Sequence, residues 1–226
     1  MTTSTIRRLL SAAVATSLTT AVLSAALSSA QAKRVQQAAE VLTEIHKVPD
    51  KDIPQDLWTK AACVIVVPDM KKAAFVFGGE YGKGLMSCRN GGTWSAPVFM
   101  RVEKGSWGLQ IGAQEIDLVL LVMNDGGVQK LLNNKVTLGA EISAAAGPVG
   151  RDARAATDGQ LNAEILSYSR TQGLFAGINL SGGAVRPDDD DNVALYGRNV
   201  PPKQIVAGEN IKVPAEAQPF MTALHR

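Results

Sequence analysis

The chain has 226 residues, of which 46% are hydrophobic and 19% are charged. This composition supplies enough apolar residues for a folded core and excludes a largely disordered chain, while the length fits one sizeable domain. The 23 basic and 21 acidic residues give a formal net charge of +2. The chain therefore lacks the strongly basic composition of a nucleic-acid-binding domain.

The first 32 residues have the pattern of a signal peptide. Arg7 and Arg8 precede an apolar stretch, residues 9–27, and the sequence Ala30-Gln31-Ala32 provides an A-x-A cleavage signal. Serine and threonine residues interrupt the stretch, so a permanent membrane anchor is the weaker interpretation. We expect residues 1–32 to be removed and the protein to be exported to the periplasm or cell envelope, or secreted. The chain from residue 33 then carries 21 basic and 21 acidic residues.

Helical periodicity characterises the segment that follows. Five apolar residues fall on one face of a helix of about four turns: Val35, Ala38, Ala39, Leu42 and Ile45. This amphipathic helix is expected to end before Pro49. A second, short helix is predicted with Pro54 in its first turn and with Leu57 and Trp58 on its inner face.

From residue 63 to residue 123 the sequence predicts one strand after another. The runs CVIVVP, AAFVFGGEYG, GLMSCR, WSAPVFMRVE, WGLQIGAQ and IDLVLLVM are separated by turn residues, and Asp69–Lys72 is expected to be one such turn. Asn124 or Asp125 is expected to cap a short helix. Further strands and two short C-terminal helices follow. The pattern predicts a single α+β domain with a mainly antiparallel, curved or barrel-like sheet.

The two cysteines, Cys63 and Cys88, lie 25 positions apart on predicted strands. In an exported protein they can form a disulfide between neighbouring strands. A free, buried thiol at Cys63 fits its apolar surroundings equally well. The sequence leaves both states open, and it predicts no metal site and no cofactor.

Two stretches invite a ligand-binding interpretation and do not support it. The stretch FGGEYGKG, residues 77–84, lacks the Gly-Lys-Ser/Thr ending of a phosphate-binding loop and leads into a strand instead of a helix. A hairpin or a bulge in a bent sheet explains it better. The acidic run Asp188–Asp191 lacks the spacing of an EF-hand, so we expect one residue of the run to cap a helix and the others to be solvated.

The sequence predicts no catalytic residues. His46 lies on the first predicted helix and His225 is the penultimate residue, and neither belongs to a motif that places a base beside a nucleophile. A hydrolase would need a nucleophile within hydrogen-bond reach of His46. The chain is therefore expected not to be an enzyme.

A series of motifs in a fixed order resembles the SYLF-domain family. The series begins with CVIVVP and FVFGGEYGKGLM and continues with WSAPVFMRVEKGSWGLQIGAQEIDLVLLVMN, GAEISAAAGPVGR, ILSYSRTQGLFAGINLSG and DNVALYG. The resemblance covers about residues 34–200, leaves residues 201–226 as a C-terminal tail, and suggests a stand-alone, exported bacterial member. The family implies binding of phosphoinositides and other anionic lipids, and in some members binding of actin.

The resemblance implies a non-catalytic lipid-binding protein that engages anionic phospholipid or a membrane surface. An envelope structural or protein-interaction module without bound lipid is the alternative. The helix that contacts membranes in some members matches a segment containing Lys33, Arg34, Val35, Leu42, Ile45 and Lys47. Basic residues near glycine-rich turns are candidate headgroup ligands: Lys71, Lys72, Lys83, Arg89, Arg151 and Arg154. The lipid and the oligomeric state are left open.

Overall fold

The computed structural model describes residues 27–45, 47, 53–74, 77–107, 112–149, 162–171, 174–208 and 211–225. Within these ranges, only the backbone is described for residues 72–74, 77–78, 106–107 and 112–114. Residues 1–26, which make up most of the expected signal peptide, lie outside the described part. None of the described helices is long and apolar enough to cross a membrane.

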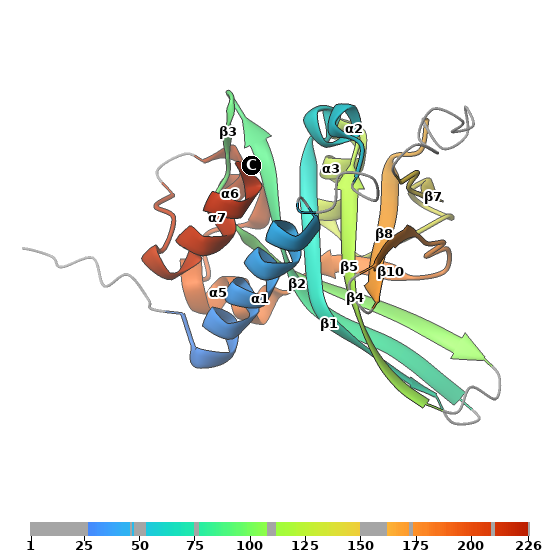
Figure 1. The fold of residues 1–226 in the computed structure, drawn as a ribbon. Coiled ribbons are helices and arrows are strands. Elements are labelled where there is room, and N and C mark those ends of the chain that lie inside the picture. The colour runs from blue at the N-terminus through green and yellow to red at the C-terminus, as the bar shows by residue number, and fades with distance from the viewer. Residues whose placement is uncertain are drawn as a thin grey trace, which may run out of the picture.

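One ten-stranded sheet forms the centre of the fold (Figure 1). Its strands are β1 (Cys63–Ala74), β2 (Phe77–Asn90), β3 (Thr93–Trp94), β4 (Val98–Trp107), β5 (Gly112–Val122), β6 (Val136–Thr137), β7 (Ala144–Ala146), β8 (Ile165–Thr171), β9 (Leu174–Gly177) and β10 (Ala184–Pro187). The helices are α1 (Ser29–Ile45), α2 (Gln55–Lys60), α3 (Asp125–Asn133), α5 (Asp189–Tyr196), α6 (Pro202–Ala207), the short 3-10 helix η3 (Ala215–Ala217) and α7 (Gln218–Leu224).

The sheet is a curled half-barrel with the strand order β6-β10-β4-β2-β1-β5-β8-β7, to which β3 is added beside β2 and β9 beside β8. The paired strands run antiparallel except for β7 and β8, which are parallel. The expected α+β domain with a mainly antiparallel, curved sheet is confirmed, as are the N-terminal helix and the short C-terminal helices.

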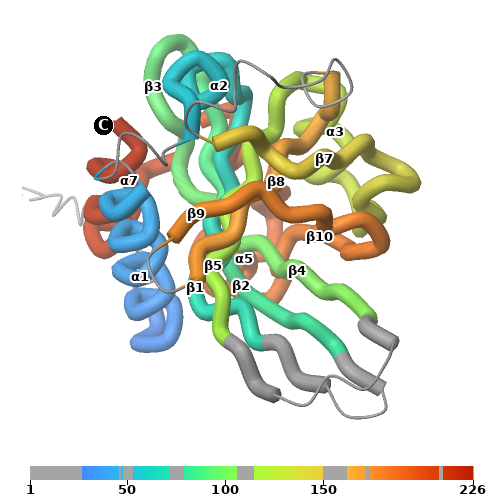
Figure 2. The backbone as a smooth tube through the Cα atoms, turned by 45° about the vertical axis from the view of Figure 1, so that its right-hand side comes forward, coloured from blue at the N-terminus to red at the C-terminus, as the bar shows by residue number. Residues whose placement is uncertain are grey.

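The central strands are buried on both faces, which explains their nearly continuous apolar runs. Along β1, Val64 and Val66 face one core, which α1, α2 and α7 cover. Ile65 and Val67 face a second core, which α3 and α6 cover. On the first face α1 and α7 lie side by side (Figures 1 and 2). Buried residues of α6 and α7 complete both cores, so residues 202–224 are an integral part of the domain and not a separate tail.

The stretch Asp69–Lys72 is a bulge inside β1, and the expectation of a turn there was wrong. The register of β1 shifts by one residue against both β2 and β5 near Asp69. Asp69 adopts a φ of 49°, and its backbone N–H donates to a carboxylate oxygen of Asp117 over 3.0 Å. This bond satisfies a polar group that the extra residue removes from the strand pairing.

The glycines of FGGEYGKG belong to β2 and lie opposite this bulge. A Cβ atom at Gly84 would lie 2.2 Å from the carbonyl oxygen of Val66, and one at Gly82 would lie 2.5 Å from a methyl carbon of Val67. The glycines therefore allow β1 and β2 to approach closely where the sheet bends. The stretch itself is neither a hairpin nor a bulge, because it runs as continuous strand in β2 and the bulge lies in β1; of the interpretation only the bent sheet is confirmed.

Cys63 and Cys88 are direct cross-strand partners in β1 and β2 and form a disulfide. Of the two states that the sequence leaves open, the structure therefore has the bonded one. Both residues are buried in the core that α3 and α6 cover.

Candidate binding site

Helix α1 packs its apolar face onto the sheet. Val35, Leu42 and Ile45 are completely buried in the core shared with α7, so in this conformation they are not available to a membrane, contrary to the sequence-based expectation. The physical reason is that the apolar face of an amphipathic helix can be buried by a sheet as well as by a lipid surface. Lys33 and Lys47 remain exposed.

Two of the expected headgroup ligands make contacts within the fold instead. The guanidinium of Arg89 lies over the ring of Trp94 at 4.2 Å from its centroid and donates to the carbonyl oxygens of Ala61 and Trp58. Lys83 points to two carboxylates, with its Nζ 2.6 Å from Asp188 Oδ2 and 3.1 Å from Asp191 Oδ2. In this conformation both residues therefore contribute to the stability of the fold, and headgroup binding by them stays a prediction.

Among the remaining expected ligands, only Lys71 has a side chain that the structure describes. Lys71 is exposed on β1, and the side chain of Lys72 is outside the described part of the chain. Arg151 and Arg154 lie outside the described residues altogether. The structure therefore brings no group of the six expected residues together among those whose side chains it describes.

The acidic run at the start of α5 forms a buried ion network. Asp188 is completely buried and accepts from Arg101 over 2.5 Å. Asp191 accepts from Arg34 of α1 over 2.7 Å. We call these residues, together with Lys83, the α1–α5 network. The expectation that most of the run is solvated was wrong for Asp188 and Asp191, because three cations converge there from α1, β2 and β4; Asp190 remains 94% exposed.

Electrostatics favour the ionised forms of Asp191 and Lys83 within the α1–α5 network. Burial raises the pKa of Asp191, but Arg34 and Lys83 lower it more, so the net pKa is below the usual value. Burial lowers the pKa of Lys83, but the carboxylates of Asp188 and Asp191 raise it more, so the net pKa is above the usual value. These groups therefore stay charged near neutral pH and lock α1 to α5.

The first turn of α1 is part of the same arrangement. Ser28 and Gln31 form a reciprocal cap, in which the backbone N–H of each residue donates to the side-chain oxygen of the other. The amide of the buried Gln31 also donates to Asp191. Residues 28–31 are thus integrated into the fold, although the expected cleavage site follows Ala32.

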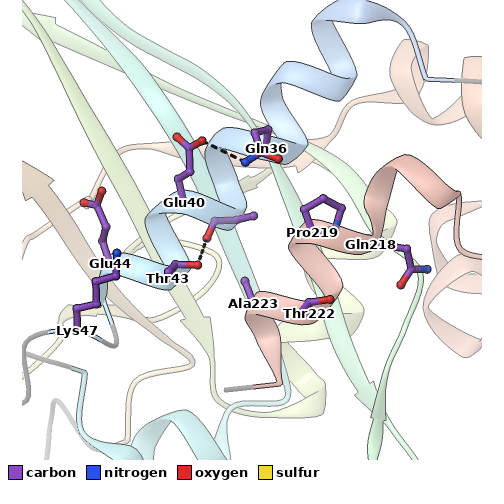
Figure 3. A pocket seen from close by; sticks show the side chains of 10 residues that line it. Gln36, Glu40, Thr43, Glu44, Lys47, Gln218, Pro219, Thr222 and Ala223 are labelled. Carbon is purple, nitrogen blue, oxygen red and sulfur yellow. Dashed lines mark hydrogen bonds between the residues drawn. The ribbon is translucent and has the colours of Figure 1, made fainter.

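One concave surface of the described part is a groove between α1 and α7 (Figure 3). Its volume is about 490 Å³, and residues from successive turns of α1 line it opposite Gln218, Pro219 and Thr222 of α7. The groove contains two carboxylates, Glu40 and Glu44, of which Glu44 is paired with Arg170. With Lys47 as its one lysine and no arginine, the groove does not suit an anionic ligand.

A second concave surface is a cavity of about 690 Å³ that brings together three cations from separate elements. Lys135 lies between α3 and β6, Arg186 lies on β10 and Lys203 lies in the first turn of α6. Asn133, Asn134 and the acidic Asp189 also line it. We call this surface the three-cation cavity.

Strand register explains why two of these cations are close together. Val136 of β6 pairs with Val185 of β10, which places the preceding Lys135 beside the following Arg186. Glu103 of β4 binds both: its carboxylate accepts from Arg186 over 3.1 Å and lies 3.5 Å from Lys135. Burial raises the pKa of Glu103, but Arg186 and Lys135 lower it more, and the net pKa is below the usual value.

Comparison with known protein families assigns the chain to one of them. Residues 103–226 match the family described as Ysc84, Las17-binding protein actin regulator. The chain belongs to the Ysc84 family. This is the SYLF-domain family that the sequence motifs resemble, and the matched segment includes the three-cation cavity.

Three curated Ysc84 relatives illustrate the similarity. The chain is 35% identical over 177 residues to SH3 domain-containing protein PJ696.02 of Schizosaccharomyces pombe and 31% identical over 198 residues to Protein YSC84 of Saccharomyces cerevisiae. It is 29% identical over 197 residues to SH3 domain-containing YSC84-like protein 1 of Rattus norvegicus. These alignments cover 76%, 84% and 84% of this chain but only 41%, 42% and 57% of the relatives.

The described part of this Ysc84 domain offers no assembled metal site. No group of three His, Cys, Asp or Glu residues is placed to hold a metal ion among the described residues. His225 is exposed near the C-terminus, and His46, on which a hydrolase interpretation depends, lies outside the described part. The sequence reasoning missed Lys135, Arg186 and Lys203, since they are 17 or more positions apart and only the β6–β10 pairing and the position of α6 bring them together.

Proposed function

We propose that this Ysc84 domain is a non-catalytic binding module for anionic phospholipid at a membrane surface. The three-cation cavity is the observation that carries the proposal, because it is an open, concave site where three cations outnumber the acidic Asp189. Arginine and lysine are the side chains that bind phosphate in proteins. Each cation near an anionic lipid surface contributes about 1 kcal/mol of binding free energy.

In this proposal Lys203 makes the primary contact. Lys203 is exposed and has no ion-pair partner among the described residues, so it is free to approach a headgroup. Arg186 is partly buried and its guanidinium binds Glu103. Both side chains line the cavity, and a lysine together with an arginine suits a phosphate group.

We also propose that the protein acts after export. Two features support this proposal: the N-terminal sequence, which has the pattern of a signal peptide, and the Cys63–Cys88 disulfide, which persists in oxidising compartments. The lipid would then be that of the cell envelope.

Vesicle flotation tests the lipid-binding proposal. The full chain is mixed with phosphatidylcholine vesicles, with or without phosphatidic acid, at low and at high salt. We expect flotation with the anionic vesicles that weakens in high salt, because exposed charges are screened. Flotation with the neutral vesicles measures any membrane binding that the apolar residues 9–27 contribute.

Paired substitutions locate the binding. Lys203→Gln combined with Arg186→Gln should weaken binding to anionic vesicles by roughly tenfold or more, on the basis of about 1 kcal/mol per cation. Lys60→Gln, at an exposed lysine of α2 outside the cavity, is the matched control and should bind as the unchanged protein does. If no vesicles float the protein under any condition, lipid binding is wrong and the protein-interaction alternative takes its place.

A further inference from the structure

The three-cation cavity contains a counterion supplied by the protein itself. Arg101 and Arg186 are direct cross-strand partners on β4 and β10, an arrangement that repels unless each charge is compensated. Asp188 compensates Arg101 over 2.5 Å. Glu103, two residues along β4 on the same face, compensates Arg186 and also approaches Lys135. One carboxylate therefore neutralises part of the charge of two cavity cations.

Arg186 nevertheless keeps a hydrogen-bond donor that is not used. Its Nη2 donates to Glu103, whereas its Nε is buried and has no hydrogen-bond partner in the structure. A buried donor without an acceptor is costly, and such groups in folded proteins usually find a partner. An arginine can serve a tetrahedral oxyanion with two donors at once, and Glu103 accepts from only one of these donors, Nη2.

We propose that Glu103 is the internal counterion of the three-cation cavity and that the ligand that displaces it is a phosphate dianion. A ligand with a single negative charge would replace the carboxylate of Glu103 by one equivalent charge. Its binding free energy would therefore gain little from the exchange. A phosphate monoester carries a charge close to −2 near neutral pH and three free oxygens. It provides one oxygen each for Lys135, Arg186 and Lys203. Its total negative charge also exceeds the single negative charge that the Glu103 carboxylate supplies.

Asp189 opposes the binding of any anion at this site. Its carboxylate also lines the cavity and repels a ligand in proportion to the charge of that ligand, so the dianion must engage all three cations to bind. The selected chemistry can come from a lipid headgroup, such as phosphatidic acid, or from a free phosphate. The lipid source rests on the function proposed above, whereas the role of Glu103 does not.

Glu103→Gln tests the inference with two probes in the full chain. Inorganic phosphate is titrated by calorimetry, and flotation compares vesicles that contain phosphatidic acid with vesicles that contain phosphatidylglycerol, a phosphodiester. We expect the substitution to strengthen the binding of inorganic phosphate and of phosphatidic acid by roughly tenfold. It should also reduce the preference for phosphatidic acid over phosphatidylglycerol, because the singly charged headgroup of phosphatidylglycerol then no longer competes with Glu103 for the cations.

Controls separate this effect from a general change of charge or of folding. Glu115→Gln removes an exposed carboxylate of β5, outside the cavity lining, and should leave both affinities unchanged. Thermal unfolding of the Glu103→Gln protein should stay close to that of the unchanged protein, because its ion pairs are partly exposed. If the affinity rises equally in both substituted proteins, the effect is one of net charge and the role of Glu103 is overturned.

The two proposals fail in different ways. If the unchanged protein floats with phosphatidic acid and Glu103→Gln alters neither affinity nor preference, lipid binding stands and the counterion role is wrong. If Glu103→Gln strengthens only the binding of inorganic phosphate and neither protein floats with any vesicle, the counterion role stands and the lipid function is wrong. If neither protein binds inorganic phosphate or vesicles, both are wrong.

Discussion

Asp191 ties the N-terminal helix to the rest of the molecule through a single carboxylate. It accepts from Arg34 over 2.7 Å and from Lys83 over 3.1 Å, and the buried Gln31 donates to it as well. Charge-assisted hydrogen bonds that are shielded from water are stronger than those on the surface. The stability of the domain should therefore depend on this side chain far more than on Asp190 beside it, which is 94% exposed.

Asp191→Asn should lower the free energy of unfolding at pH 7 by about 2 kcal/mol, as expected for lost hydrogen bonds to a charged group. The pKa of Asp191 is lower in the folded state than in the unfolded state, so its contribution is present above the unfolded pKa, about 4, and is lost as the pH falls through the folded pKa. Urea denaturation at pH 7 and at about pH 3 measures this difference. Asp190→Asn is the control, and an equal loss of stability there would contradict the prediction.

At the scale of single elements, the first turn of α1 belongs to the folded domain. Ser28 caps it, Gln31 is buried, and Leu27 packs against the core below α1 and α7. The sequence pattern places a cleavage signal at Ala30-Gln31-Ala32. Such a pattern of small residues does not reveal which of these residues make contacts in the folded protein. Residues 27–32 therefore have a structural role that the signal-peptide interpretation could not include.

A chain that starts at Lys33 should be less stable than one that starts at Leu27. The loss of the cap costs about 1 kcal/mol, and the lost contacts of Gln31 and Leu27 add to it. We expect the melting temperature, measured by circular dichroism, to fall by roughly 4 °C or more. Ser28→Ala in the longer chain should reproduce only that part of the fall in melting temperature that comes from the loss of the cap. Equal melting temperatures for the two chains would show that the first turn is dispensable.

The elements that could be predicted are those whose signal is local. Apolar residues at helical spacing indicated α1, and Asn124 caps α3 as predicted, with its side chain accepting from the backbone N–H of Gly127 over 2.8 Å. The Pro68-Asp69 pair after an apolar run is typical of a turn, whereas the structure has a bulge at Asp69. The backbone N–H of Asp69 in this bulge donates to Asp117, 48 positions away, and no local pattern records that bond.

The candidate site depended even more on distant parts of the chain. Lys83 and Arg89 were correctly recognised as cations near a glycine-rich stretch, but their partners, Asp188 and the Trp94 ring, decide that they are structural. Lys203, which has no ion-pair partner among the described residues, and Lys135, which stays 57% exposed beside Glu103, lie in unremarkable polar segments. Charge alone does not distinguish these cases; the distinction is how far the fold buries each cation against its partners.

At the scale of the whole molecule, the sheet connects two hydrophobic cores. Neighbouring residues of β1 point alternately into one core and the other, and β5 does the same with Leu120 and Leu121. A strand buried on both faces cannot lose one core while it keeps the other in place. The α1 side and the α3 side should therefore unfold together, and α5 links them as well, because Leu195 packs against the first core and Tyr196 against the second.

Leu42→Ala on α1 and Leu131→Ala on α3 test this coupling, because each leucine is completely buried in a different core. Each substitution should reduce the free energy of unfolding by about 2–5 kcal/mol, and the double substitution should add the two losses, because the sites share no contacts across the sheet. Leu174→Ala, at a leucine of β9 that is 54% exposed, should cost less than about 1 kcal/mol.

The decisive readout is whether two probes of unfolding coincide. Trp58 and Trp94 both lie in the core below α1, with ring centroids 6.5 Å apart, so tryptophan fluorescence is weighted towards that side, whereas far-ultraviolet circular dichroism reports the whole molecule. In urea, the two curves should have the same midpoint for every substituted protein. If Leu131→Ala shifts the circular dichroism curve and leaves the fluorescence curve in place, the cores unfold separately. The sheet would then be two adjoining units, and α1 could remain docked after the side that carries the three-cation cavity has unfolded.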